Sequence, residues 1–472
     1  MPPEILDLVM QRLCVQDIIH LAQTCSRIRA SIRGSKYPLA HAVNTSQVMS
    51  VHLKTIDMMS PMELYDAAAK ATALSARMTP DTADHTLMPR RRLTFDIKGS
   101  PDHFWNRMLL LDNFIFFVLS NLHNDTLWIL DLSSGLMRSR DYDSISGLDY
   151  QAVAQSNSVL VFLAIYSENS EMTGHSLIVD EFTLDTGRLG YCKTHFVMRC
   201  EGMEEIPSVS LEVKGDRVAF IWFGGILVVD WKEKRALELE LEFAQYTDYT
   251  VIVHACFHPS HNSVIAGYRC GDLYETASIG LPELPPLTEE NKIWVNTELN
   301  HGVLELQDLD LFRERQSWGK DARLPSTIFR QNGGCDTYDA VIFPPKQPEA
   351  EYISAEHLRY STQTWKGFKI PISSVVQPPI ACHGTDEERI APNGAPFLFI
   401  DQSEKCVYTL RLADDYHRET TWVRLSTISS NLYKEGDDPL DGKALHNCIA
   451  GYDTLQGRLV LFVDQRLEVL EY

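Results

Sequence analysis

The sequence predicts a multidomain α+β chain in which a small helical head precedes a large all-β body. Apolar residues recur at helical spacing over the first 36 residues, and a capped, alanine-rich segment follows at 60–78. From about residue 93, short β-branched and aromatic runs alternate with Gly, Asp, Asn and Ser turns. A length of 472 residues suits one small domain beside one large core. We therefore predict a head at 1–45, a helical connector and linker at 46–92, and a β body at 93–472.

Composition excludes several classes of protein. The 64 acidic and 43 basic residues give a net charge of −21, which opposes non-specific nucleic-acid binding. Ten cysteines without a CxxC pair predict reduced thiols and a cytoplasmic or nuclear location. The longest apolar run, at 218–229, is interrupted by Gly224 and Gly225. It is too short to cross a bilayer and predicts two buried strands, so we expect no membrane partner.

The head is predicted to hold three short helices. Ile5, Val9 and Leu13 recur every four residues and form one apolar stripe. Asp17 can cap a second helix, and a third stops at Gly34. Five basic and three acidic residues give the first 36 positions a net charge of +2, which leaves −23 for the rest. Helices this short bury too little surface to be stable alone, so the head needs a partner, either the rest of the chain or another protein.

The segment MPPEILDLVMQRLCVQDIIHLAQTCSRIRASI resembles the F-box, a helical motif that binds the Skp-family adaptor of cullin–RING ubiquitin ligases. The matching residues are Pro2, Pro3, Glu4, Ile5, Leu6, Leu13, Asp17, Ile18, Ile19, Leu21, Cys25, Arg27 and Ile28. Met1 replaces the usual first leucine, and Cys14 replaces the usual proline after the first helix. The motif starts at residue 1, which leaves room for upstream residues. The alternative is an ordinary three-helix element inside a larger domain.

This resemblance implies that the apolar helix faces bind the adaptor and, through it, cullin. An exposed aliphatic patch needs a partner, and the positive head suits an acidic one. The adaptor-binding candidates are Pro3, Glu4, Ile5, Leu6, Val9, Leu13, Asp17, Ile18, Leu21, Cys25 and Ile28.

The connector is predicted to contain one helix. Ser60 and Glu63 form a capping box with Pro61 at the first helical position, and the alanine-rich run continues to Met78. Residues 79–92 are predicted to be a linker. We expect the arginines at 90–92 to be solvated there, with a phosphate or partner contact as the alternative.

The body contains one sequence repeat, in which an aliphatic strand is followed by an Asp, a short turn and a second strand. It occurs at 126–135, 180–189, 225–237, 397–410 and 459–470. A period near 50 residues predicts a β-propeller of six to eight blades, with seven favoured. The segment 255–275 resembles a WD-repeat strand pair. We expect the last strand to close the ring beside a strand near residue 110. Two β-sandwich domains are the alternative.

Signals of chemistry are few. The sequence has no GxSxG, P-loop, GxGxxG or HExxH motif, so we predict no catalytic residue and no cofactor. A metal-like group comprises His254, Cys256, His258 and His261, which we expect to pack within the β body instead.

The expected function is that of a substrate-recognition subunit of an SCF-type ubiquitin ligase, with the head on the adaptor and the body on an unknown protein target. Such a subunit contributes proximity and orientation, not a catalytic group. The alternatives are an F-box interaction protein without a ligase role and an enzyme with a propeller body.

Overall fold

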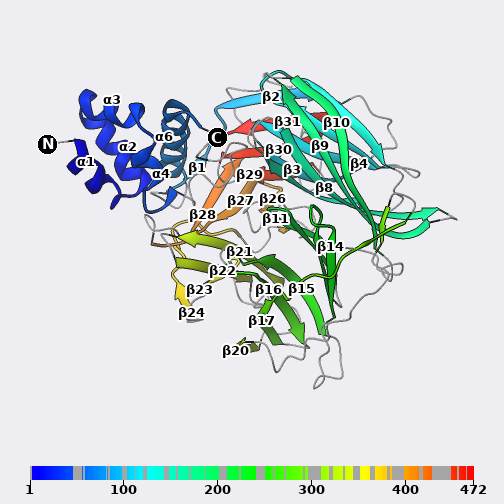
Figure 1. Ribbon diagram of the computed structural model, residues 1–472. Helices are drawn as coiled ribbons and strands as arrows, with labels where there is room; N and C mark the ends of the chain where they lie inside the picture. Colours follow the sequence, from blue (N-terminus) through cyan, green and yellow to red (C-terminus); the bar gives the residue numbers. More distant parts are fainter. Residues whose placement is uncertain are drawn as a thin grey trace. The chain divides into compact units, whose positions relative to one another are not determined.

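The computed structural model describes most of the chain (Figure 1). The described residues are 3–45, 56, 59–80, 82, 85–97, 104–111, 113–120, 125–142, 148–155, 158–169, 172–185, 188–200, 210–222, 225–240, 250–258, 261–270, 273–290, 293–295, 310–317, 323–332, 335–343, 351–361, 367–379, 383–384, 398–413, 418–427, 448–453, 456–463 and 465–472. The chain forms two compact units. Unit 1 comprises residues 1–101, 107–114 and 325–472, and unit 2 comprises 102–106 and 115–324.

Helices occupy the N-terminal part of unit 1. They are α1 (Pro3–Met10), α2 (Val15–Thr24), α3 (Ser26–Gly34), α4 (Tyr37–Ala40) and α6 (Pro61–Arg77). The three predicted head helices are present, and α4 adds a short fourth one. Their buried core includes Met10, Ile18, Ile32 and Leu39, together with Leu64 from α6. Among the described residues, no helix is long and apolar enough to cross a membrane.

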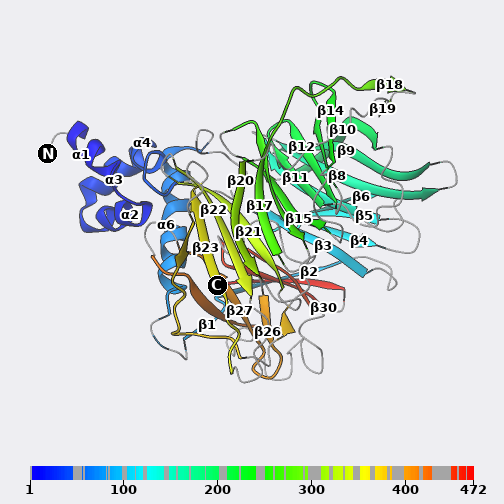
Figure 2. The same cartoon turned by 90° about the horizontal axis from the view of Figure 1, so that it is seen from below.

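Helix α6 belongs to two cores. Its capping box is present as predicted, because Ser60 Oγ accepts from Glu63 N and Glu63 accepts from Ser60 N. The first half of α6 packs with α2 and α3, whereas Leu74 and Met78 pack against strands of unit 1. Figures 1 and 2 both show α6 between the other helices and those strands. The helix therefore joins the head to the β-structure of unit 1.

The strands of the C-terminal part form three sheets. The first has the order β21-β22-β23-β24, with β21 (Arg323–Asn332), β22 (Cys335–Phe343), β23 (Glu356–Ser361) and β24 (Gly367–Ile370). The second has the order β1-β28-β27-β26-β25, with β1 (Thr86–Leu87), β25 (His383–Gly384), β26 (Leu398–Asp401), β27 (Cys406–Arg411) and β28 (Thr421–Ser426). The third has the order β2-β31-β30-β29, with β2 (Arg91–Asp96), β29 (Ile449–Asp453), β30 (Arg458–Val463) and β31 (Arg466–Glu471).

Four more sheets precede these along the chain. One has the order β3-β4-β5-β6, with β3 (Phe104–Leu111), β4 (Phe114–Ser120), β5 (Asp125–Asp131) and β6 (Met137–Tyr142). The next contains β7 (Leu148–Ala154), β8 (Ser158–Asn169), β9 (Met172–Asp185) and β10 (Arg188–Cys200) in chain order. A third has β11 (Ser210–Lys214), β12 (Arg217–Trp222), β13 (Gly225–Asp230) and β14 (Arg235–Glu240). A fourth has β15 (Thr250–Phe257), β16 (Ser263–Cys270), β17 (Leu273–Gly280) and β20 (Asp310–Ser317).

A hairpin of β18 (Thr288–Glu290) and β19 (Ile293–Val295) extends the sheet of β7–β10, because β19 pairs in parallel with β10. The segment before it spans neighbouring sheets. Leu284 packs in the core that β11–β14 share with β15–β17, and Leu287 packs in the core shared with β7–β10. Lys234 supports this segment, since its carbonyl accepts from Leu287 N and its ammonium lies 4.2 Å from the Trp294 ring centroid.

Within each unit, described sheets that follow one another along the chain share buried apolar cores. Each of four buried apolar clusters draws its members from two sheets that follow one another along the chain. The predicted class is confirmed: N-terminal helices precede a body of antiparallel sheets with the consecutive strand order of propeller blades. The described residues form seven sheets, and the number of blades stays a prediction.

Each copy of the predicted sequence repeat forms a β-hairpin. These hairpins are β5–β6, β9–β10, β13–β14, β26–β27 and β30–β31. In several hairpins an Asp carboxylate accepts a backbone N–H two or three residues later, and the fourth residue after the Asp has a positive φ. Within the repeat these pairs are Asp131 and Gly135, Asp230 and Lys234, and Asp401 and Lys405. The turn between β29 and β30, outside the repeat, has the same arrangement at Asp453 and Gly457. Because the Asp closes the turn through contacts with neighbouring residues, these hairpins could be predicted from the sequence.

Two expectations about the linker and the closing strand were wrong. β1 and β2 lie within the predicted linker at 79–92 and across its end, so β-structure begins at Thr86. The closing strand β31 pairs with β2, not with a strand near residue 110. Of the arginines at 90–92, Arg90 and Arg91 are exposed as expected, whereas Arg92 is half-buried and forms an ion pair with Glu468 of β31. Strand pairing over such a sequence separation leaves no local signal in a basic segment.

Candidate functional site

Helix α1 presents an apolar face to solvent. Ile5, Leu8 and Val9 are 49%, 62% and 45% exposed, and their i, i+3, i+4 spacing places them on one side of the helix. Met10 is fully buried and anchors the opposite side in the head core. Exposed aliphatic side chains cluster here at a cost in hydration, which is typical of an interaction surface.

The start of α2 is fixed by a buried polar contact. Asn44 is fully buried, its Oδ1 accepts from Val15 N at 2.8 Å, and its Nδ2 donates to Gln16 Oε1 at 2.8 Å. Asn44 therefore satisfies one of the free N–H groups at the first turn of α2, where the N-cap residue Cys14 makes no side-chain cap. This contact ties the break between α1 and α2 to the segment after α4.

Tyr37 extends the apolar face toward α4. It is 42% exposed, its hydroxyl accepts a hydrogen bond from Gln11 Nε2, and its ring centroid lies 4.2 Å from that of His41. We call Ile5, Leu8, Val9 and Tyr37 the α1 face. Sequence reasoning missed Leu8 and Tyr37. For Leu8 a signal existed, since it lies three residues after Ile5 on the same stripe.

The structure separates the sequence-predicted residues by exposure. Pro3, Glu4 and Leu6 lie in α1, with side chains outside the described set. Ile5, Val9 and Cys25 are exposed, while Leu13, Asp17, Leu21 and Ile28 are half-buried. Ile18 is fully buried in the head core, so it supports the fold of the head and lies outside the α1 face.

The described members of the metal-like group, Cys256, His258 and His261, do not form a metal site. Among the described residues, no three His, Cys, Asp or Glu side chains are placed to share a metal ion. His258 Nδ1 instead accepts from His261 N at 3.0 Å, and the two rings stack at 4.2 Å. Burial and the nearby Glu212 carboxylate raise the pKa of the Cys256 thiol, which disfavours the thiolate that a metal would bind. The side chain of His254 lies outside the described set.

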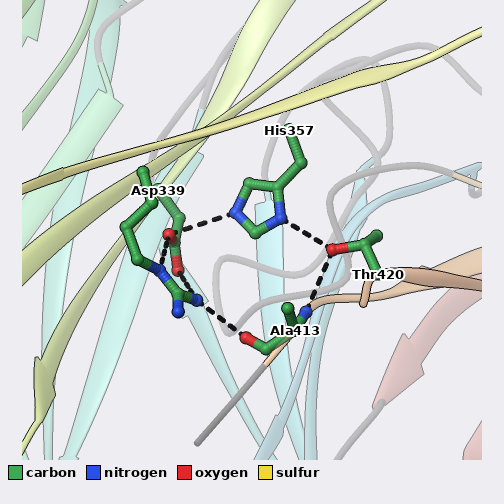
Figure 3. A network of polar contacts seen from close by, with 5 residues as sticks. Asp339, His357, Ala413 and Thr420 are labelled. Carbon is green, nitrogen blue, oxygen red and sulfur yellow. Dashed lines mark hydrogen bonds and ion pairs between the residues drawn. The ribbon is translucent and has the colours of Figure 1, made fainter. Parts of the chain in front are cut away.

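A polar network in unit 1 (Figure 3) resembles catalytic machinery, but its hydroxyl group belongs to a buried residue. Thr420 Oγ1 accepts from Ala413 N at 3.0 Å and lies 2.6 Å from His357 Nδ1. His357 Nε2 lies 3.1 Å from Asp339 Oδ1, which also accepts from Arg359 Nε at 2.6 Å. Asp339, His357 and Thr420 are all 0% exposed. Because the hydroxyl is sealed from solvent, we assign the network to joining the sheet of β21–β24 with that of β25–β28.

Comparison with known protein families supports the assignment of the helical head. The model of the F-box domain matches residues 1–38. No curated protein matches the chain. Solved structures similar to it include the WD40 domain of SCAP from fission yeast, with 9% identity over 76% of this chain and 82% of that one, and a TM-score of 0.37.

Two further solved structures are similar. KlHsv2 with loop 6CD replaced by a Gly-Ser linker has 12% identity over 69% of this chain and 85% of that one, with a TM-score of 0.31. The Malassezia sympodialis allergen Mala s 1 has 13% identity over 73% and 98%, with a TM-score of 0.31. All three TM-scores are low, so the description of the β body rests on its own sheets and cores. The head is the firmer assignment: residues 1–38 are an F-box domain, carried at the start of a chain with a largely β body.

Proposed function

We propose that this protein is the substrate-recognition subunit of an SCF-type cullin–RING ubiquitin ligase. The α1 face carries the proposal, since it is an exposed apolar surface on an F-box domain. F-box domains bind Skp-type adaptors, and this face is the surface that we assign to the adaptor. Cullin would join through the adaptor, and the β body would bind the protein target.

The connection between head and body supports this role. Arg411, at the end of β27, donates from Nη1 to Ser75 O at 3.3 Å and from Nη2 to Ser75 Oγ at 3.0 Å. Leu74 packs against the core shared by β26–β31. A subunit that works by orientation requires a fixed path from adaptor to target, and α6 supplies one within unit 1.

We place this activity in the cytoplasm or nucleus. The cysteines that the structure describes are free thiols, as a reducing compartment maintains them. The target is proposed to be a protein, and the strong negative charge of the body favours basic target segments.

The test is affinity purification of the full chain beside the Leu8→Asp variant. Wild type should recover adaptor and cullin, and the variant should lose both while its thermal unfolding is unchanged, because Leu8 is 62% exposed. Full adaptor recovery by Leu8→Asp would remove the α1 face from the proposal. Deleting residues 1–38 should lengthen the half-life of a bound target. Bound proteins with unchanged half-lives would favour an F-box interaction protein without a ligase role.

A further inference from the structure

Both ends of helix α6 carry a hydroxyl residue followed by proline. Ser60 and Pro61 start the helix, and Thr79 and Pro80 follow its last turn. Proline-directed protein kinases modify this type of dipeptide. The sequence has one more example, Ser100 and Pro101, which lies outside the described residues. The two ends of α6 differ in what surrounds the hydroxyl.

The Thr79 hydroxyl faces a guanidinium. Arg411 Nη1 donates to Thr79 Oγ1 at 2.9 Å, while Nη2 is held by Ser75 Oγ at 3.0 Å. Thr79 Oγ1 also donates to Ser75 O at 3.1 Å. Thr79 is half-buried at a bend directly after the helix, and Thr82 beyond it is exposed. An arginine fork is thus already fixed beside a half-buried hydroxyl, and this fork geometry favours a phosphate.

Further arginines lie near this end of α6. Arg77 is the last helical residue and donates from Nη2 to Met88 O at 3.3 Å. Burial and the nearby positive charge of Arg90 lower the pKa of the Arg77 guanidinium, so cations crowd this region. Their charge offsets the unfavourable interaction between an anion and a helix C-terminus.

We propose that Thr79 is a phosphorylation site whose phosphate is bound by Arg411. A protein kinase would transfer the γ-phosphoryl group of ATP: the bond from Thr79 Oγ1 to phosphorus forms, the bond to the β-phosphate oxygen breaks, ADP leaves, and the hydroxyl proton passes to the kinase base. The hydrogen bond from Thr79 Oγ1 to Ser75 O is lost. Charge-assisted bonds to Arg411 replace it and fasten the end of α6 to β27.

Ser60 offers the opposite case on the same helix. Its Oγ accepts from Glu63 N, and its own N–H donates to Glu63 Oε2 at 2.7 Å. A phosphate on Ser60 would stand beside the Glu63 carboxylate, and like charges would break the capping box. The same modification should therefore tighten one end of α6 and loosen the other.

The experiment uses the full chain with Ser60→Asn and Ser100→Ala, since Asn keeps an N-cap and both changes remove the competing acceptors. A proline-directed kinase and ATP are added to the folded protein, and mass spectrometry locates the phosphate. Phosphorylation at Thr79 should slow amide hydrogen exchange in the last turn of α6 by about tenfold.

Arg411→Gln, compared with its own unphosphorylated form, should abolish this slowing. If Arg411→Gln does not fold, Arg411→Lys replaces it and should give a smaller slowing, because lysine lacks the fork. The proposal is overturned by absence of phosphate on Thr79, by unchanged or faster exchange, or by equal slowing in the Arg411 variant. None of these readouts depends on adaptor binding, so they stand apart from the proposed ligase role.

Discussion

Arg92 of β2 and Glu468 of β31 form an ion pair across 376 positions of sequence, with Nε and Oε2 3.1 Å apart. The Glu468 side chain is 1% exposed and that of Arg92 is 20% exposed. This pair lies where the first long strand of the sheet meets the last, so it stabilises the closure of that sheet.

Arg92→Met should lower the free energy of unfolding by about 3 kcal/mol, because it leaves the Glu468 carboxylate buried without its cation. Urea denaturation of full-length variants measures it. Arg466→Met on the same sheet is the matched control. The side chains of Arg466 and Asp96 are 60% and 82% exposed, so loss of their ion pair should lower the free energy of unfolding by less than about 1 kcal/mol. Equal effects of the two changes would show that burial of Glu468 contributes nothing.

Substitutions at Ile18 and Leu8 should separate effects on the stability of the head from effects on adaptor binding. Ile18→Ala should destabilise the head by about 2–5 kcal/mol, because Ile18 is fully buried. Leu8→Ala should change stability by less than about 0.5 kcal/mol and weaken adaptor binding. Amide exchange in α2 reports the first effect, and titration with purified adaptor reports the second. Tight adaptor binding by Leu8→Ala, or an unaffected head in Ile18→Ala, would contradict this division.

Thr420→Val should destabilise unit 1 although it preserves shape. The change removes the partner of Ala413 N and of His357 Nδ1, at about 1–3 kcal/mol for each buried polar group. Thr420→Ser retains the hydroxyl and should remain within about 1 kcal/mol of wild type. Chemical denaturation followed by tryptophan fluorescence can test this through Trp422, which is buried in the adjacent core. Equal stability of the Val and Ser variants would refute a structural role for the network.

Gly457→Ala should lower the thermal stability of the protein for two separable reasons. Its φ of +62° strains any residue with a Cβ, and an added Cβ would lie 2.6 Å from Leu74 Cδ1. Gly215 has a φ of +60° and open space around it, so Gly215→Ala should cost only the strain, about 1–2 kcal/mol. Thermal unfolding should show the larger loss at Gly457, and adding Leu74→Ala should recover part of the difference. Without that recovery, the clash with α6 is not the cause.

Cys25 should be the first of the described thiols to react with iodoacetamide. The nearby backbone N–H groups of Ile28 and Arg27, at the start of α3, lower the pKa of Cys25, whereas burial raises the pKa of Cys200 to about 12. Because the thiolate reacts, labelling of Cys25 should persist to lower pH than that of an ordinary cysteine. Peptide mapping after timed labelling provides the measurement. Adaptor should slow labelling if Cys25 lies in the interface, and unchanged labelling would place Cys25 outside it.

Sequence predicted the parts of the fold whose cause is local. The capping box needs only Ser60 and Glu63, which lie three residues apart, and in three of the hairpins Asp131, Asp230 and Asp401 close their own turns. The F-box match was readable because its residues are contiguous. The α1 face could be only partly predicted, since the stripe Ile5, Val9 and Leu13 does not say which helices cover it.

Long-range contacts explain which features of the structure could not be predicted from the sequence. Nothing near Arg92 indicates that Glu468 lies beside it, so the start of the β body was placed in a linker. Burial of Ile18 depends on α6, whose Leu64 reaches the same core from 46 residues away. The hairpin of β18 and β19 joins β10 after two intervening sheets, a path that no local pattern specifies.

The pairing of β2 with β31 also bears on how the chain folds. This sheet is complete only when residues more than 360 positions apart meet, which imposes a large loop-closure entropy and a slow step. The head, whose contacts are far more local, should form early. Until the two strands meet, their edges stay open to other chains, so refolding at high protein concentration should favour aggregation through these edges.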